Sequence, residues 1–102
     1  MYIHKPALFE WDEGKNTYNQ AKHGLRFEEA LGFNWDKALF LDRSRFVDEE
    51  PRYAAVNYFR KKLHTIIFTR RGTMTRIISM RRSNRQEEKD YEKAIAQKTE
   101  GI

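Results

Sequence analysis

The alternation of apolar and polar residues along the chain predicts five strands. Two-residue turns are expected at Lys61-Lys62 and at Arg71-Gly72, because Gly72 accepts a positive φ without strain. The segment Thr65–Phe68 is apolar on both alternations, which is typical of a central strand covered on both faces. The predicted strands are Leu8–Trp11, Lys37–Leu41, Tyr53–Arg60, Leu63–Arg70 and Thr73–Arg82.

Helical spacing of the remaining apolar residues predicts three helices. The first begins after Asp12, whose carboxylate suits an N-cap, and ends at His23. A second, shorter helix is expected over residues 27–35, and the last begins after a cap at Ser83 or Asn84. The resulting order, β-α-α-β-β-β-β-α, indicates an α+β fold. We expect an antiparallel β-sheet with two N-terminal helices and one C-terminal helix packed on it.

The length and composition fit one small domain that spans residues 1–102, with a core over about residues 8–97. The absence of cysteine excludes disulfides, thiolate metal sites and cysteine nucleophiles. Neither a membrane span nor the apolar core of a signal peptide is recognisable. We therefore expect a cytoplasmic protein.

The charge is distributed unevenly along the chain. Residues 1–50 have a net charge of −3, whereas residues 51–102 have a net charge of +8. This asymmetry favours one basic surface that binds a polyanion such as nucleic acid. The alternative is a solvated surface that is basic without binding one.

Arginine dominates the basic half, and its planar guanidinium group can donate two hydrogen bonds to one phosphate. The alternative is that these charges protect the edge of a sheet against aggregation. The arginines that are candidates for binding an RNA backbone are Arg70, Arg76, Arg81, Arg82 and Arg85.

The predicted register of the last hairpin sorts these side chains by face. With its turn at the two residues named above, Ser79 lies opposite His64, and Arg81 shares their face. Arg76 and Arg82 then point to the other face.

Three further residues are candidates for proton transfer. His23 and His64 are candidates because an imidazole group titrates near neutral pH. The alternatives are that His23 serves as a cation at a helix end and His64 as a surface residue of a strand. Tyr91 is a candidate acid or phosphate ligand, or else a core residue with its hydroxyl group at the rim.

Metal and nucleotide chemistry are not favoured by the sequence. The acidic residues Asp36, Asp42 and 48–50 lack the spacing of metal ligands, and there is no Gly-rich phosphate loop. We expect neither a metal ion nor another cofactor.

Several short motifs, in a fixed order over residues 9–91, together resemble the BrnT toxin family. They are Phe9-Glu10-Trp11-Asp12, Lys15 with Asn19, Lys22-His23-Gly24, Phe27-Glu28-Glu29-Ala30, Ile67-Phe68-Thr69-Arg70, the segment Arg76–Arg82, and Glu87, Glu88 and Tyr91. The resemblance implies a metal-independent endoribonuclease with a RelE-like fold, the toxin of a type II toxin–antitoxin pair. It also implies a BrnA-like ribbon-helix-helix antitoxin as partner, in a DNA-binding complex that represses its own operon.

The resemblance and the charge pattern together give a set of predicted site residues. We predict that His23, Arg76, Arg81 and Tyr91 are catalytic. Binding of the RNA phosphates is assigned to Lys22, Arg70, Arg82 and Arg85. The alternative functions are a non-catalytic module that binds nucleic acid and a subunit that chiefly binds another protein.

Overall fold

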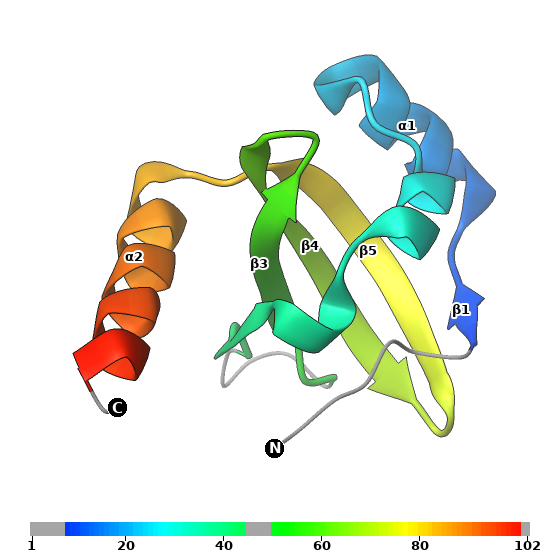
Figure 1. Cartoon of the computed structure of the whole chain (residues 1–102). Coiled ribbons are helices and arrows are strands. Elements are labelled where there is room, and N and C mark those ends of the chain that lie inside the picture. The colour runs from blue at the N-terminus through cyan, green and yellow to red at the C-terminus, as the bar shows by residue number, and fades with distance from the viewer. Residues whose placement is uncertain (1–7, 45–49, 101–102) are drawn as a thin grey trace.

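The computed structural model describes residues 8–44 and 50–100, which form five strands, two α-helices and two 3₁₀ helices (Figure 1). Their order confirms the α+β class. Along the chain they are β1 (Phe9–Glu10), α1 (Glu13–His23), η1 (Phe27–Gly32), η2 (Trp35–Lys37), β2 (Leu39–Asp42), β3 (Tyr53–Phe59), β4 (Lys62–Arg71), β5 (Met74–Arg82) and α2 (Arg85–Glu100).

The five strands form one sheet in the order β1-β5-β4-β3-β2. Strands β2 to β5 pair antiparallel, as expected, but β1 pairs parallel with β5 through Phe9 and Glu10. The sheet is therefore mixed, and the prediction of a purely antiparallel sheet is wrong. Because most of the chain separates β1 from β5, no hairpin turn constrains their relative direction.

Two short 3₁₀ helices, η1 and η2, replace the second α-helix that was predicted over residues 27–35. The buried residues Phe27, Ala30 and Phe33 recur every three positions, which is the period of a 3₁₀ helix. The chain then turns so that the indole Nε1 of Trp35 donates to the carbonyl oxygen of Ala30 at 2.9 Å. A three-residue spacing is compatible with both helix types, so the apolar pattern alone does not separate them.

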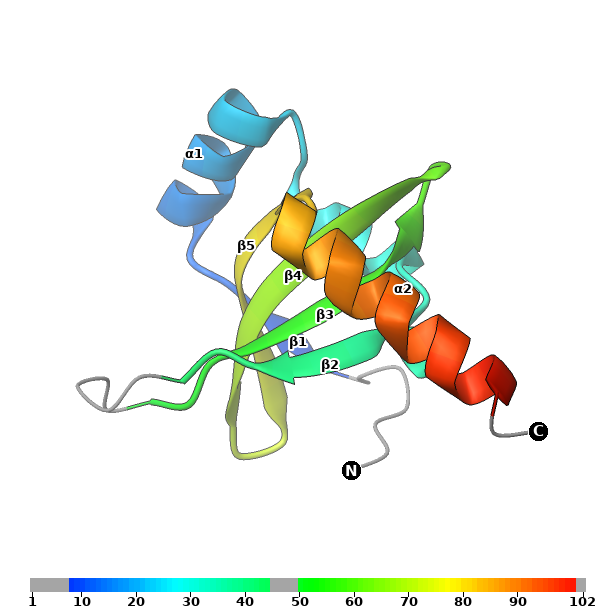
Figure 2. The same cartoon turned by 90° about the vertical axis from the view of Figure 1, so that its left-hand side faces the viewer.

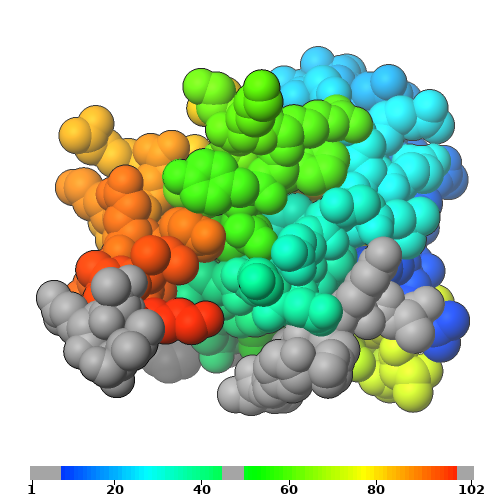
Figure 3. All heavy atoms as spheres, viewed as in Figure 1, coloured from blue at the N-terminus to red at the C-terminus, as the bar shows by residue number. Residues whose placement is uncertain are grey.

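The 3₁₀ helices cover one face of the sheet, where the apolar core lies. We call this the core face; its strand residues are Ala55, Ile66, Phe68, Ile77 and Met80. Trp35 lies at its centre, and its ring contacts those of Phe9, Phe33 and Phe68. In Figure 3 the blue-green atoms of these helices and of β2 fill the middle of the surface.

The helix ends confirm the predicted caps. The carboxylate of Asp12 accepts from the backbone N–H of Lys15 at 3.0 Å, and Gly24 ends α1 with a φ of 73°. Asn84, one of the two predicted caps of the last helix, accepts from the backbone N–H of Glu87 at 2.8 Å.

Both hairpin turns lie one residue away from their predicted positions. Arg60 and Lys61, both with positive φ, form the turn between β3 and β4. The turn between β4 and β5 is formed by Gly72 and Thr73, and Gly72 has a φ of 60°. Glycine thus occupies the first central position, as in a type II′ turn.

The register of β4 and β5 differs from the prediction. Ser79 pairs with Ile67 rather than with His64, and His64 pairs with Arg82. The displaced turn shifts the β5 partner of each β4 residue by two positions from the predicted one. Beyond a β-bulge in β5, the partners are shifted by one further position. The bulged residue is Ile78, which has no opposite residue in β4.

Candidate active site

The sheet face opposite the core carries two of the arginines of β5. Directly paired residues of antiparallel strands point to the same face, so Arg81 lies beside Thr65 and Arg76 beside Thr69. In Figure 2, α2 crosses in front of this side of the sheet, and α1 lies near one end of β5. We call it the arginine face; its residues on β4 and β5 are Thr65, Ile67, Thr69, Arg71, Met74, Arg76, Ser79 and Arg81.

The β-bulge explains how Arg76 and Arg81 reach the same face. In a regular strand, an odd separation in sequence places two residues on opposite faces. The extra residue Ile78 lies between the two arginines and restores a common face. The prediction that Arg76 points away from Arg81 is therefore wrong. The prediction for Arg82 is confirmed, since its partner His64 lies on the core side.

Arg81 is fixed by a bidentate ion pair with Glu87, which lies in the first turn of α2. Its Nη1 lies 2.7 Å from Oε1 of Glu87, and its Nη2 lies 3.0 Å from Oε2. Nη1 also donates to the carbonyl oxygen of Arg82 at 3.3 Å. The two parallel bonds fix the plane of the guanidinium group, which a single contact would not do.

Glu87 itself is buried, with 1% of its surface exposed. Its Oε1 also accepts from the hydroxyl group of Thr65 at 3.0 Å and from the backbone N–H of Asn84 at 2.8 Å. Burial alone would raise the pKa of Glu87. The hydrogen bonds from Arg81, Asn84 and Thr65, with the charge of Arg81, outweigh it and lower the pKa below its ordinary value.

A second arginine contacts the same carboxylate from the β2 edge of the sheet. Arg43 follows β2, and its Nη2 donates to Oε2 of Glu87 at 3.2 Å. Its backbone N–H donates to the carbonyl oxygen of Arg52 at 2.7 Å, which extends the pairing of β2 with β3. Glu87 thus binds two guanidinium groups that come from strands at opposite sides of β3 and β4.

His23, the last residue of α1, lies close enough to Arg81 for their charges to interact. Burial, followed by the positive charges of Lys22 and Arg81, lowers the pKa of the His23 imidazole below its usual value. A neutral imidazole at physiological pH is able to accept a proton. The structure therefore brings together two predicted site residues, His23 and Arg81.

Arg76 lies further along the arginine face and pairs with β1. Its Nη1 lies 3.3 Å from Oε2 of Glu10, the residue opposite it in the parallel pair. Both side chains are partly exposed, so the ion pair leaves Arg76 accessible to a ligand.

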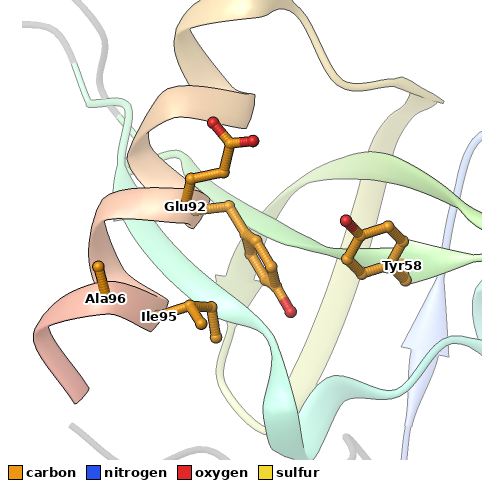
Figure 4. Close-up of a pocket in the computed structure, with 5 residues that line it drawn as sticks. Tyr58, Glu92, Ile95 and Ala96 are labelled. Carbon is orange, nitrogen blue, oxygen red and sulfur yellow. The ribbon is translucent and has the colours of Figure 1, made fainter. Parts of the chain in front are cut away.

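Tyr91 lies one helical turn beyond Glu87, on the same side of α2. Its hydroxyl group donates to Oδ1 of Asn57 at 3.2 Å, and its ring contacts Tyr58 edge-on. Burial, with Tyr58 nearby, raises the pKa of Tyr91 above its ordinary value. An apolar pocket between α2 and β3 surrounds it (Figure 4); its lining residues are Tyr58, Tyr91, Glu92, Ile95 and Ala96.

The four predicted phosphate-binding residues are exposed but do not share one surface. Lys22 precedes His23, with its Nζ 5.7 Å from the centre of the Tyr18 ring. Arg85 is the first residue of α2. Arg70 and Arg82 occupy β4 and β5 positions whose side chains point to the side of the core face. The structure therefore separates Arg70 and Arg82 from Arg81.

His64, which was expected beside Ser79 and Arg81, is buried on the core side. Its Nδ1 lies 2.8 Å from the carbonyl oxygen of Lys62, and its ring contacts Phe59 edge-on. It does not share a face with Arg81, because the register of the hairpin differs from the expected one.

Sequence reasoning missed two residues of this cluster, Arg43 and Glu87. Glu87 stands three residues after Asn84, a spacing that is typical of a helix capping box, and this local role conceals its contacts with the sheet. Arg43 lies in a charged segment after a short strand, where no pattern distinguishes one arginine from its neighbours.

The described part of the chain contains no group of three or more His, Asp or Glu side chains that could bind a metal ion. Among the same residues, no helix is long and apolar enough to cross a membrane.

A comparison with known protein families identifies the family of this chain. The family model described as ribonuclease toxin, BrnT, of type II toxin–antitoxin systems matches residues 11–87. No curated protein matches the chain at a significant level. The match places the chain in the class of ribonuclease toxins, whose target is RNA and whose partner is an antitoxin. Because the match covers most of the sequence, the chain belongs to the BrnT family.

Proposed function

We propose that this chain is an endoribonuclease that cleaves RNA without a metal ion and thereby inhibits translation. The observation that carries the proposal is that Asn19, one turn before His23, is hydrogen-bonded to Met80, the residue before Arg81. Burial, followed by the charges of Lys22 and Arg81, lowers the pKa of the His23 imidazole. A candidate proton acceptor and a candidate phosphate ligand are thus held near each other, in a family of ribonuclease toxins. From the family resemblance we also propose that the fold is related to that of RelE.

In the reaction, the phosphorus atom exchanges its bond to the 5′-oxygen for a bond to the neighbouring 2′-oxygen. His23 accepts the proton of the 2′-hydroxyl as its oxygen attacks the phosphorus atom. The bond between phosphorus and the 5′-oxygen breaks, and that oxygen takes up a proton from Tyr91 or from water. The products are a 2′,3′-cyclic phosphate and a free 5′-hydroxyl group.

The arginines supply the electrostatic part of the mechanism. Arg81 donates to the phosphate oxygens on which negative charge develops, and a well-placed donor of this kind lowers the barrier by roughly 3–4 kcal/mol. Arg76, on the same face, binds the strand further along. Lys22 and Arg85 extend the basic surface, whereas Arg70 and Arg82, whose side chains point to the side of the core face, would contact RNA only outside the arginine face.

The partner is a BrnA-like ribbon-helix-helix antitoxin, and the two proteins form a complex that binds operator DNA. The basic charge of residues 51–102 supports an acidic region in the toxin-binding part of that partner. Co-expression of such a protein is expected to restore growth to cells that express this chain, and the purified complex is expected to shift DNA of its own operon.

Cleavage of RNA by the purified protein in the presence of EDTA tests the enzymatic part. We expect fragments with cyclic phosphate ends, and in Arg81→Ala a rate about 10²–10³ times lower. Arg26→Ala serves as a matched control, because Arg26 is also ion-paired but is exposed beside η1. Cleavage that requires a divalent ion, or an Arg81→Ala variant as fast as the control, contradicts the mechanism.

A further inference from the structure

Arg81 lies on β5 and Arg43 follows β2, yet their side chains converge on one oxygen atom. Nη2 of Arg81 lies 3.0 Å from Oε2 of Glu87, and Nη2 of Arg43 lies 3.2 Å from the same atom. The two terminal nitrogens are therefore no farther apart than the sum of these distances. A single phosphate group, with oxygens on several sides, spans such a separation.

The charge of this cluster favours an anion. Two guanidinium groups and one carboxylate leave a net positive charge. The carboxylate has 1% of its side chain exposed, whereas the side chains of Arg81 and Arg43 are 25% and 36% exposed. An anion that approaches the cluster therefore meets guanidinium groups, while the carboxylate lies behind them.

Both arginines retain N–H groups beyond those that bind Glu87. A guanidinium group carries five N–H donors, and Arg43 donates one of them to Glu87 in the described contacts. Arg81 donates from Nη1 and Nη2 to Glu87 and again from Nη1 to the carbonyl oxygen of Arg82. The bound carboxylate thus fixes the orientation of both groups without occupying all of their donors.

The geometry points to a two-arginine phosphate clamp, formed by Arg43 and Arg81 and oriented by Glu87. Glu87 is a positioning residue, since its burial separates it from the substrate. This inference rests on the proposed ribonuclease function and adds a binding residue, Arg43, from the β2 edge of the sheet. The ligand is one phosphodiester of an RNA strand that crosses the arginine face.

The clamp fits the charge change of the proposed reaction. A phosphodiester carries one negative charge, and attack by the 2′-oxygen adds a second as the pentavalent phosphate forms. After neutralisation of one guanidinium group by Glu87, the cluster keeps one net positive charge, which compensates the charge that the attack adds. Because Glu87 fixes both groups before the substrate binds, little reorganisation accompanies the reaction.

Binding and cleavage by Arg43→Ala test the clamp against the charge-matched control Arg26→Ala. The binding probe is a fluorescein-labelled single-stranded oligonucleotide with 2′-O-methyl groups, which binds but has no 2′-hydroxyl to attack. We expect Arg43→Ala to bind it about tenfold more weakly than Arg26→Ala and to cleave unmodified RNA correspondingly more slowly. Equal binding and cleavage by the two variants overturn the clamp.

The role of Glu87 is tested with Glu87→Gln. The amide oxygen of the new side chain still accepts from Thr65 and Asn84, but its NH₂ group faces the two guanidinium donors. We expect kcat to fall at least about tenfold, with the pH dependence of kcat unchanged in shape. If kcat of Glu87→Gln no longer decreases at low pH, Glu87 is the general base and the positioning role is overturned. An unchanged kcat overturns it as well.

Asn84→Ala separates this effect from a loss of stability. It removes the cap of α2 but keeps Glu87 and both arginines, so it is expected to lower Tm while kcat changes less than about twofold. Circular dichroism confirms that each variant is folded at the assay temperature. If Asn84→Ala lowers kcat as much as Glu87→Gln does, the effect of Glu87 is structural and the positioning role is overturned.

The design separates failure of the clamp from failure of the proposed function. If the wild type binds the probe but cleaves no RNA, the ribonuclease proposal fails, and the binding of Arg43→Ala still decides the clamp. If it cleaves RNA but Arg43→Ala equals the control, the clamp alone fails. If it neither binds nor cleaves, both are overturned.

Discussion

The side-chain amide of Asn19 pairs with both backbone polar groups of Met80, as a neighbouring strand would. Its Nδ2 donates to the carbonyl oxygen of Met80 at 2.8 Å, and its Oδ1 accepts from the N–H of Met80 at 3.1 Å. The same Nδ2 donates to the carbonyl oxygen of Leu25 at 2.8 Å. His23 lies one turn after Asn19, and Arg81 follows Met80, so this pairing also sets the distance between the two proposed site residues.

Asn19→Ala is therefore expected to reduce both stability and activity. It leaves three buried backbone groups without a partner, and we expect a loss of about 2–4 kcal/mol in the free energy of unfolding. Urea denaturation measures this loss, with Gln20→Ala as the exposed neighbouring control, for which a change within about 0.5 kcal/mol is expected. A similar midpoint for both variants argues against the role of Asn19.

The pKa of His23 is expected below the ordinary value of about 6.5, and to rise in Lys22→Gln and in Arg81→Gln. Each substitution removes a positive charge that disfavours the imidazolium form. Burial is the largest cause, so part of the depression is expected to persist in both variants. NMR titration of the imidazole measures these pKa values, and His23→Gln identifies the resonance. An imidazole that titrates at or above 6.5 in the wild type contradicts its role as a neutral base.

Acid is expected to weaken the attachment of α2 to the sheet. Because the pKa of Glu87 is lower in the folded chain than in the unfolded one, its stabilising effect is present in full above the unfolded value of about 4.3. It is lost as the pH falls through the lower, folded value. We expect the stability difference between wild type and Glu87→Gln to shrink below about pH 4, as measured by urea denaturation at several pH values. A difference that grows on acidification reverses the sign of the proposed effect.

The turn at Arg60 and Lys61 contains strain that glycine relieves. Both residues have positive φ, which costs a residue with a side chain about 1–2 kcal/mol. Lys61→Gly is expected to raise the stability by about 0.5–1 kcal/mol after the entropy cost of glycine. Lys62→Gly removes the same charge from β4 and is expected to lower it by a similar amount. Thermal unfolding compares the two, and a Lys61→Gly variant less stable than wild type contradicts the assigned turn.

Features that depend on a few consecutive residues follow from the sequence. The caps at Asp12, Gly24 and Asn84 are confirmed, because capping requires one suitable side chain or a glycine beside a helical pattern. The α+β class is confirmed for the same reason, since each strand and each α-helix shows its own period. The family resemblance, which rests on several such motifs in order, is confirmed over residues 11–87.

Features that depend on pairing between residues far apart in the chain do not follow from the sequence. A turn displaced by one residue and a bulge at Ile78 change every partner in β5, although neither alters the apolar pattern visibly. The ion pair of Arg43 with Glu87 joins residues that are 44 positions apart. The predicted register therefore separated Arg76 from Arg81, whereas the structure has both on one face.

The bulge at Ile78 also has a genetic consequence. Ile77 and Ile78 are identical neighbours, so an in-frame deletion of either codon produces the same polypeptide. The remaining isoleucine can pair with Phe68, as Ile77 does, while Ser79 keeps Ile67 and the ladder becomes regular. Such a deletion would leave Arg76 and Arg81 four residues apart, an even separation that keeps both on a common face of a regular strand. Loss of one residue from this strand is thus compatible with the arginine face.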